Sequence, residues 1–198
     1  MASQITHIVY GKKIFDRMAD SNWHDFVIGT VFPDIRYLAK LDRNSTHIFH
    51  TKEINIPKKN SFKAGFYTHC FVDEKREEIL QSLGMYKLIP HDYLHATAIK
   101  MLEDYFNFPL FADWKSIITI LEDTLSEEES YGVDKVTVKS WHAGIQQYIN
   151  VGPTEASWES VLVDIIPEVT AKQIAKKAWE LKQDQSICDI LKKVYSLI

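Results

Sequence analysis

Apolar side chains recur at helical spacing along most of this chain, and the pattern predicts a protein built from helices. The first such stretch covers residues 5–19, with Thr6 expected to cap it. A last amphipathic stretch is expected to begin at Pro167 and to run to the C-terminus. Between them, helices are expected from residue 61 to about 80 or 84, from 91 to about 106, from 113 to about 125 and from 134 to about 150.

An apolar run over residues 23–35 contains a proline near its end. Pro33 is expected to end a helix and to bias Phe32 towards an extended conformation. Asp34 then follows a buried segment on a turn, from which its carboxylate can point back into the interior. A polar loop over residues 42–47 comes next.

The helix predicted from residue 61 sets a histidine and a carboxylate four residues apart among apolar neighbours. His69 and Asp73 would share one face of that helix, and Glu77 would continue the stripe. Burying both groups costs on the order of several kcal/mol unless something compensates. A shared metal ion would do so, and so would a His–Asp hydrogen bond inside the core. This spacing alone leaves both interpretations open.

Length and composition favour one all-α domain over residues 1–198. Apolar residues make up 45% of the chain and charged residues 25%, which is ordinary for a globular protein. Only 7 glycines and 6 prolines are present, too few for an all-β chain full of tight turns. The net charge of -4 argues against general nucleic-acid binding.

The N-terminal residues and the cysteines give an expectation for the cellular compartment. The first seven residues lack the basic segment and apolar run of a signal peptide, and no window reaches the roughly 18 apolar residues of a membrane span. Cys70 and Cys188 form no CxxC pair. We therefore expect a cytoplasmic protein without a transmembrane segment, and the sequence leaves the oligomeric state open.

Three histidines and two aspartates in the first 80 residues could form a metal site without sulfur. They are His7, Asp34, His47, His69 and Asp73. Nitrogen and oxygen ligands suit Zn²⁺ in an open, catalytic site better than a structural zinc site, which usually draws on cysteines. Zinc is therefore the expected ion, with another divalent metal as the alternative.

Four segments occur in an order and rough spacing that resemble the zinc-dependent phospholipase C family. They are Thr6-His7-Ile8, Gly29-Thr30-Val31-Phe32-Pro33-Asp34, Thr46-His47, and Gly65-Phe66-Tyr67-Thr68-His69 with Asp73. The likeness covers about residues 5–80. It extends to the catalytic domain of glycosylphosphatidylinositol-specific phospholipase D and, more distantly, to the S1/P1 nucleases. It implies an all-α, phospholipase C/P1 nuclease-like multi-helix bundle, with a metal-site half at about 1–85 and supporting helices at about 90–198.

The resemblance also implies a ligand set. Asp34, His47, His69 and Asp73 would surround one zinc ion, and His7 with a bridging Asp73 would contribute to another. The family places a further histidine shortly after the aspartate, where this chain has Glu74-Lys75-Arg76-Glu77. One or two ions are therefore expected. The candidate replacements for the missing ligand are Glu77, His91 and His95.

The expected function is hydrolysis of phosphate esters, above all phosphodiesters, by a metal-activated water. Asp34 is the candidate catalytic residue, because a carboxylate beside the metal can orient or deprotonate that water. Arg36 and Arg43 follow it and could neutralise the phosphate. The expected partner is a small-molecule or lipid phosphate ester.

Two other functions remain open. An HD-type phosphohydrolase acting on nucleotides could use His69, His91-Asp92 and Asp104, but it leaves His7, Asp34 and His47 without a role. A non-catalytic helical module could instead use its polar residues in a buried hydrogen-bond network, or retain a structural metal and bind a partner. Metal content separates these last possibilities, because a network needs no metal.

The polar residues of the latter half are expected to have mainly structural roles. His142 stands beside the apolar face of the helix predicted at 134–150. Glu127-Glu128-Glu129 are expected to form a solvated acidic turn or a helix N-terminus.

Overall fold

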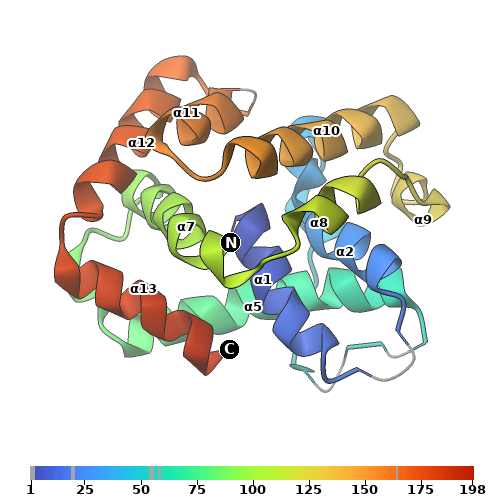
Figure 1. Ribbon diagram of the computed structural model, residues 1–198, viewed down its shortest axis with the longest axis horizontal. Helices are drawn as coiled ribbons and strands as arrows, with labels where there is room; N and C mark the ends of the chain where they lie inside the picture. The colour runs from blue at the N-terminus through green and yellow to red at the C-terminus, as the bar shows by residue number, and fades with distance from the viewer. Residues whose placement is uncertain (1–2, 19–20, 54–55, 58, 164) are drawn as a thin grey trace.

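The computed structural model describes residues 3–18, 21–53, 56–57, 59–163 and 165–198, which form helices and loops without a strand (Figure 1). The all-α prediction is confirmed. Within those ranges, no helix combines the length and apolar character needed to cross a bilayer. The elements in chain order are α1 (Gln4–Phe15), α2 (Trp23–Val31), η1 (Phe32–Ile35), α3 (Arg36–Ala39), α4 (Arg43–Thr46), α5 (Ser61–Ser82), α6 (Met85–Leu88), α7 (Tyr93–Asn107), η3 (Phe108–Leu110), α8 (Trp114–Ile120), α9 (Ser126–Glu129), α10 (Lys135–Val151), α11 (Glu155–Val163), α12 (Glu168–Leu181) and α13 (Gln185–Leu197).

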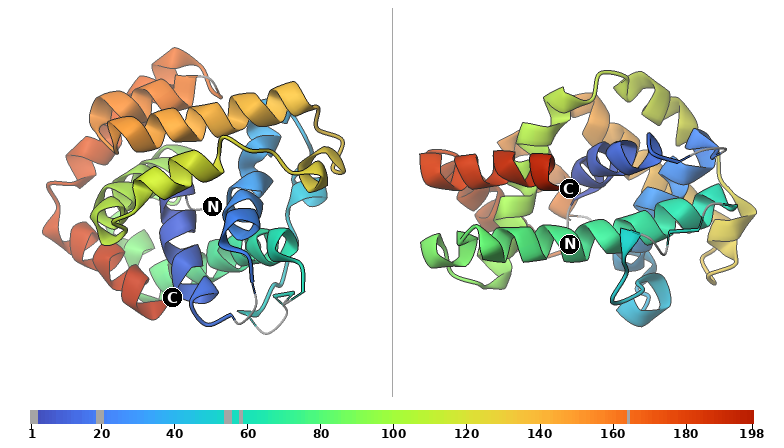
Figure 2. Two further views of the ribbon diagram at one scale, coloured as in Figure 1. Left: turned by 45° about the vertical axis from the view of Figure 1, so that its right-hand side comes forward. Right: turned by 90° about the horizontal axis from the view of Figure 1, so that it is seen from below.

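Helix α1 is central and contacts α2, α5 and α7 (Figure 1). Its residues Ile5, Ile8 and Tyr10 are almost wholly buried, as expected for a helix covered on several sides. Helix α5 runs along the lower side of this centre in Figure 1, and α10, α11 and α12 lie along its upper side. The left view in Figure 2 shows the same order of layers. A candidate site on α1 is therefore deep in the molecule.

Helices α2 and α5 pack closely through two glycines. A Cβ at Gly29 would lie 2.0 Å from the carbonyl oxygen of Phe62, and one at Gly65 would lie 2.0 Å from that of Phe26. Only a residue without a side chain permits such an approach. The close contact brings the end of α2, and with it Asp34, beside α5. The two glycines of the resembling segments thus have a packing role.

The first helix differs from its predicted bounds. It begins at Gln4 with Ser3 in the N-cap position, so the expectation that Thr6 caps it was wrong. Thr6 lies inside the first turn, where a side chain from another helix accepts its N–H. The helix ends at Phe15, and Ala19, which the prediction included, lies outside the described residues.

The expectation of an extended Phe32 was also wrong. Its φ of -64° and ψ of -44° are helical, and η1 continues the chain from α2 into α3. Pro33 stands in the first positions of η1, where its fixed φ suits a helical turn and its missing N–H is not needed. The ring of Phe32 packs 5.5 Å from that of Phe62. Asp34 is nevertheless buried, as its position after the apolar run predicted.

Several other elements depart from the prediction. The segment expected as a loop at 42–47 contains the helical turn α4, and α8 ends at residue 120 because the chain turns at 121–123. The C-terminal stretch is divided into α12 and α13. The side chain of Asp184 accepts the backbone N–H groups of Ser186 and Ile187 and so caps a new helix there.

The acidic triplet lies in the first turn of α9, which confirms the helix N-terminus given as one of its two alternatives, but Glu128 is not solvated. Its side chain is fully buried, with Oε1 2.9 Å from Nε2 of His142. Its Oε2 accepts the backbone N–H of Leu125 at 2.9 Å. The partner histidine and the local cap compensate for burying this carboxylate.

Candidate metal centre

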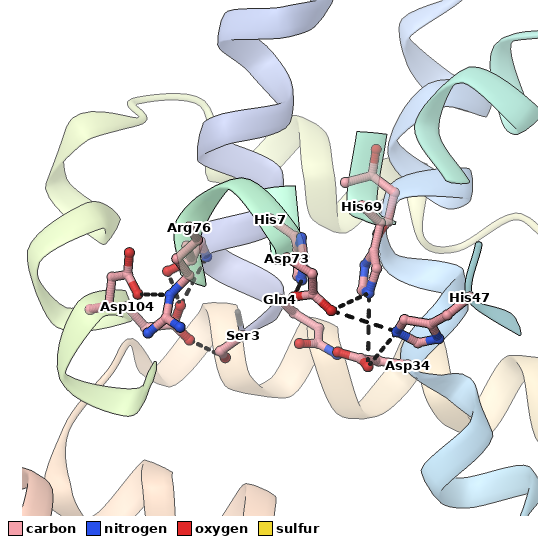
Figure 3. Close-up of polar contacts among 12 residues, drawn as sticks. Ser3, Gln4, His7, Asp34, His47, His69, Asp73, Arg76 and Asp104 are labelled. Atoms are coloured by element: carbon pink, nitrogen blue, oxygen red, sulfur yellow. Dashed lines mark hydrogen bonds and ion pairs between the residues drawn. The ribbon is translucent and has the colours of Figure 1, made fainter. Parts of the chain in front are cut away.

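Five buried side chains point toward one another where α1, η1, the end of α4 and α5 meet (Figure 3). They are the five residues proposed from the sequence as metal ligands, and no more than 5% of any of them is exposed. The structure therefore brings together residues that are up to 66 positions apart in the chain. They are His7, Asp34, His47, His69 and Asp73.

Four of these side chains surround a common space. Nε2 of His69 lies 3.9 Å from Oδ1 of Asp34 and 3.9 Å from Oδ2 of Asp73. Nε2 of His47 lies 4.0 Å and 3.7 Å from the same two oxygens. A tetrahedral zinc ion with bonds of about 2.0–2.1 Å separates its ligands by about 3.4 Å. The space is thus a few tenths of an ångström wider than a filled zinc site, so small side-chain rotations would close it.

His7 faces the other oxygen of Asp73. Its Nε2 is 3.3 Å from Oδ1 of Asp73, the oxygen that does not face His47 and His69. Its ring stacks on that of His69, with centroids 3.7 Å apart and planes 13° from parallel. Asp73 therefore faces ring nitrogens with both oxygens, which is the arrangement a bridging carboxylate needs. By proximity, both His7 with Asp34 and His69, and His47 with His69 and Asp73, could hold an ion.

Most atoms that face one another in this cluster have no hydrogen-bond partner among the described residues. They are Nε2 of His47, Nε2 of His69, Oδ1 of Asp34 and both ring nitrogens of His7. A buried polar atom left without a hydrogen bond costs about 1–3 kcal/mol, so several together are unusual in a stable core. Metal coordination would satisfy them. Their burial, their missing hydrogen bonds and the mixture of imidazole and carboxylate all fit a metal site.

The outer faces of two histidines are held by neighbouring groups. Nδ1–H of His69 donates to the carbonyl oxygen of Thr30 at 2.9 Å, which directs the lone pair of Nε2 into the cluster. Nδ1 of His47 is hydrogen-bonded to the hydroxyl of Thr46 at 3.1 Å. Metal-binding histidines are commonly oriented in this way through the nitrogen that does not bind the metal.

Two supporting residues were missed in the sequence analysis. Gln4 donates from Nε2 to Oδ2 of Asp34 at 3.2 Å, which leaves Oδ1 for the cluster. Glu74 accepts the backbone N–H groups of His50 and Thr51 at 2.6 and 2.9 Å and anchors the loop after α4. Gln4 stands one helical turn before the histidine of α1, and that spacing was the available signal. Nothing in the sequence indicates the role of Glu74.

Burial and neighbouring groups set the charges in the cluster. Burial, followed by the adjacent His7, lowers the pKa of His69 well below its usual value. This imidazole is therefore neutral at neutral pH, the form that binds metals. Burial acts to raise the pKa of Asp73, but the surrounding groups, His47 and His7 among them, hold that pKa well below its usual range. Asp73 is thus an anion.

The three candidate replacement ligands lie outside this cluster. Glu77 and His91 form an exposed pair, with Oε1 and Nε2 3.7 Å apart. Nδ1 of His95 lies 2.9 Å from Oδ1 of Asp92, the residue that caps α7. None of the three belongs to a group of described residues close enough to hold an ion. Asp104, required by the HD-type interpretation, makes its hydrogen bonds to Ser3, Thr6 and Tyr148 instead.

The two arginines considered for phosphate binding differ in position. Nη2 of Arg43 lies 3.9 Å from Oδ2 of Asp73, and 45% of the Arg43 side chain is exposed, so this cation stands at the rim of the cluster. Arg36 donates from Nη2 to the hydroxyl of Tyr37 at 2.6 Å, and its guanidinium lies 4.0 Å from the centre of that ring. Arg43 is therefore the better placed of the two.

A cavity of about 620 Å³ opens beside Asp34 and Gln4. Lys100 of α7 is on its wall and is a further residue that the sequence analysis missed; burial, followed by the nearby Arg76, lowers its pKa. Most of the remaining wall comes from α7, α10 and the region of α11. Its apolar members include Leu38, Met101, Trp141, Ile145, Val161, Leu162, Ile165 and Ile166.

No known protein indicates the function of this site by its similarity to the chain. The resemblance to the phospholipase C family therefore stays a prediction, carried by the five residues and their geometry. Comparisons with models of protein families, with curated proteins and with solved structures gave no match.

Proposed function

We propose that this protein is a metal-dependent hydrolase of phosphate esters, with phosphodiesters as the expected substrates and zinc as the expected metal. One observation carries the proposal. Five buried imidazole and carboxylate groups face one another at 3.3–4.0 Å, and most of the facing atoms have no hydrogen bond among the described residues. Such a donor set is typical of catalytic zinc sites.

The residues divide into two groups around the proposed metal. Asp34, His47, His69 and Asp73 would hold one ion, and His7 with the second oxygen of Asp73 would contribute to another. A bound zinc ion would supply a water of lowered pKa and would polarise a phosphoryl oxygen. One or two ions are consistent with this arrangement.

The remaining chemistry is assigned to residues at the edge of the cluster. Asp34 belongs to both the cluster and the cavity wall, which supports the proposal that its carboxylate orients or deprotonates an attacking water. Gln4 holds the other oxygen of Asp34. Arg43 at the rim and Lys100 on the cavity wall are the cations proposed to attract the phosphate.

The cavity supports a substrate with an apolar part. Its volume is within the range of about 300–1,000 Å³ typical of small-molecule sites, and its wall is mainly apolar. A small-molecule or lipid phosphate ester would place its phosphate at Asp34 and its apolar group along α10 and α11. The cytoplasm is the proposed compartment, and the free thiols of Cys70 and Cys188 are compatible with it.

Hydrolysis of chromogenic esters tests the proposal. Zinc-loaded protein should hydrolyse bis(p-nitrophenyl) phosphate faster than p-nitrophenyl phosphate. Asp34→Asn should reduce the rate by at least about a hundredfold, because a general base contributes about 10²–10⁴. Asp25→Asn is the matched control, since Asp25 is on α2 and pairs with His24 outside the cluster.

Two results would contradict the proposal. Equal rates for Asp34→Asn and wild type would remove Asp34 from the reaction. Bound zinc without hydrolysis of either ester would leave a metal-binding module that is not an esterase.

A further inference from the structure

Asp104 lies behind the cluster and connects three helices. It is fully buried on α7. Its Oδ1 accepts the backbone N–H of Thr6 at 2.9 Å and the Thr6 hydroxyl at 2.7 Å. Its Oδ2 accepts the hydroxyl of Ser3, and that of Tyr148 on α10 at 2.9 Å. One carboxylate thus receives four hydrogen bonds, three of them from Ser3 and Thr6 at the N-terminal end of α1.

Asp104 takes the place of a local helix cap. Ser3 stands in the N-cap position of α1, but its side chain makes no capping hydrogen bond. The N–H of Thr6, the third residue of the helix counted from Gln4, would normally be satisfied by that side chain. Here Asp104 satisfies it from a distance of 98 positions in the chain. The N-terminus of α1 is therefore held by a residue of α7 and not by a capping side chain of its own.

The turn that Asp104 fixes is the one that faces the metal centre. Gln4 and His7 each directly follow a residue bound by Asp104, and they reach Asp34 and Asp73 respectively. Figure 3 shows Asp104 and Ser3 on one side of this turn and the cluster on the other. A shift or rotation of the first turn would move both contacts.

We infer that Asp104 is a positioning residue, which sets His7 and Gln4 against the metal centre by clamping the N-terminus of α1. The inference rests on the metal site of the proposed function. Burial raises the pKa of Asp104 to about 6, so the group is mainly an anion at neutral pH and can accept all four hydrogen bonds. Tyr148 and Ser3 also line the cavity, so the same clamp joins the cavity wall to α1.

Zinc affinity, measured by competition with a chromogenic chelator at pH 7.5, tests the inference on the full chain. Asp104→Asn should weaken binding by about tenfold, the lower end of the range for residues that orient metal ligands. Asp184→Asn should leave affinity unchanged, because Asp184 caps α13, which carries no member of the cluster. Leu191→Ala, a core truncation in α13, controls for lost stability.

A double-mutant cycle separates positioning from general structural damage. In a His7→Gln background, Asp104→Asn should weaken binding no more than about twofold further, because His7, the metal ligand of the two residues that Asp104 positions, is already lost and only the effect through Gln4 remains. Additive losses would overturn the inference. So would an unchanged affinity of Asp104→Asn in the wild-type background.

A milder variant covers the case in which Asp104→Asn does not fold. Ser3→Ala removes one of the four hydrogen bonds and should weaken zinc binding by about threefold, and no change would overturn the inference. A wild-type protein that binds no zinc would overturn this inference together with the proposed function. Tight binding by the wild type with equal binding by both variants would overturn the inference alone.

Discussion

Among the described residues, the buried histidines form two groups with carboxylates, one around His69 and one around His142, and the two groups are built differently. Around His142, every ring nitrogen has a partner: Nε2 lies 2.9 Å from Oε1 of Glu128, and Nδ1 donates to the carbonyl oxygen of Asp123 at 2.9 Å. Around His69, Nδ1 has a partner in Thr30, but Nε2 has none among the described residues. Both histidines are almost fully buried.

The difference distinguishes a structural histidine from a candidate ligand. At His142 the hydrogen bonds offset the cost of burial, so no further component is needed. At His69 no hydrogen bond among the described residues offsets the cost of burying Nε2. The same is true of other atoms in the cluster. Burial alone therefore does not indicate a metal site. The indication is several buried atoms that face one another beyond hydrogen-bonding distance.

The largest effect on stability is expected from a substitution that disturbs the helix packing around the cluster and leaves the pair of His142 and Glu128 intact. Gly65→Ala places a Cβ 2.0 Å from a backbone carbonyl oxygen, and separating α2 from α5 should cost about 3 kcal/mol of unfolding free energy. Gly144→Ala on α10 meets no atom within 4 Å and should stabilise the protein by about 0.5–1 kcal/mol. Urea denaturation measures both, and equal effects would contradict the packing role of Gly65.

The second test replaces one carboxylate by an amide in each of the two histidine–carboxylate groups, and it uses the metal-free protein. Glu128→Gln should cost about 2 kcal/mol, because the carboxylate uses one oxygen for His142 and the other to accept the N–H of Leu125, whereas an amide has only one accepting oxygen. Asp34→Asn should cost less than about 0.5 kcal/mol, since Oδ1 of Asp34 makes no hydrogen bond among the described residues. Denaturation with a chelator present gives both values. A larger loss for Asp34→Asn would mean that the cluster is a structural network.

A loss of stability smaller than that of Gly65→Ala or Glu128→Gln is expected from lowering the pH. The pKa of His69 is lowered in the folded protein, whereas the unfolded chain has the usual value near 6.5. As pH falls through 6.5, the unfolded chain takes up a proton that folded His69 does not, so stability decreases. Between pH 6.5 and 5.5 the loss should be about 1 kcal/mol. Metal-free His69→Gln should lack this component, and identical pH profiles for the two proteins would contradict it.

Most helices and the five cluster residues were predictable from the sequence. Periodic apolar positions gave the helical architecture, and the i, i+4 spacing of His69 and Asp73 gave one shared face. The conformation of Phe32 and the break at Asp184 were not predicted. The first depends on packing against α5 and the second on a capping side chain, and in both cases these contacts outweighed the local propensity.

The supporting residues of the site were largely beyond sequence reasoning. Asp104 caps a helix that begins 100 positions earlier, and Glu128 is buried because His142 lies opposite it. Such roles arise from tertiary contacts between residues far apart in the chain, for which short-range patterns carry no signal. Gln4 is the exception, because helical spacing relates it to His7.

Elemental analysis after dialysis against metal-free buffer tests the central claim most directly. The proteins to compare are wild type, His69→Ala and His142→Ala. Each variant lacks one buried histidine, so any general damage from truncating a buried side chain affects both variants. The account predicts one or two equivalents of zinc in the wild type and in His142→Ala, and loss of the metal in His69→Ala. No metal in any of the three, and none taken up after zinc is added, would contradict it.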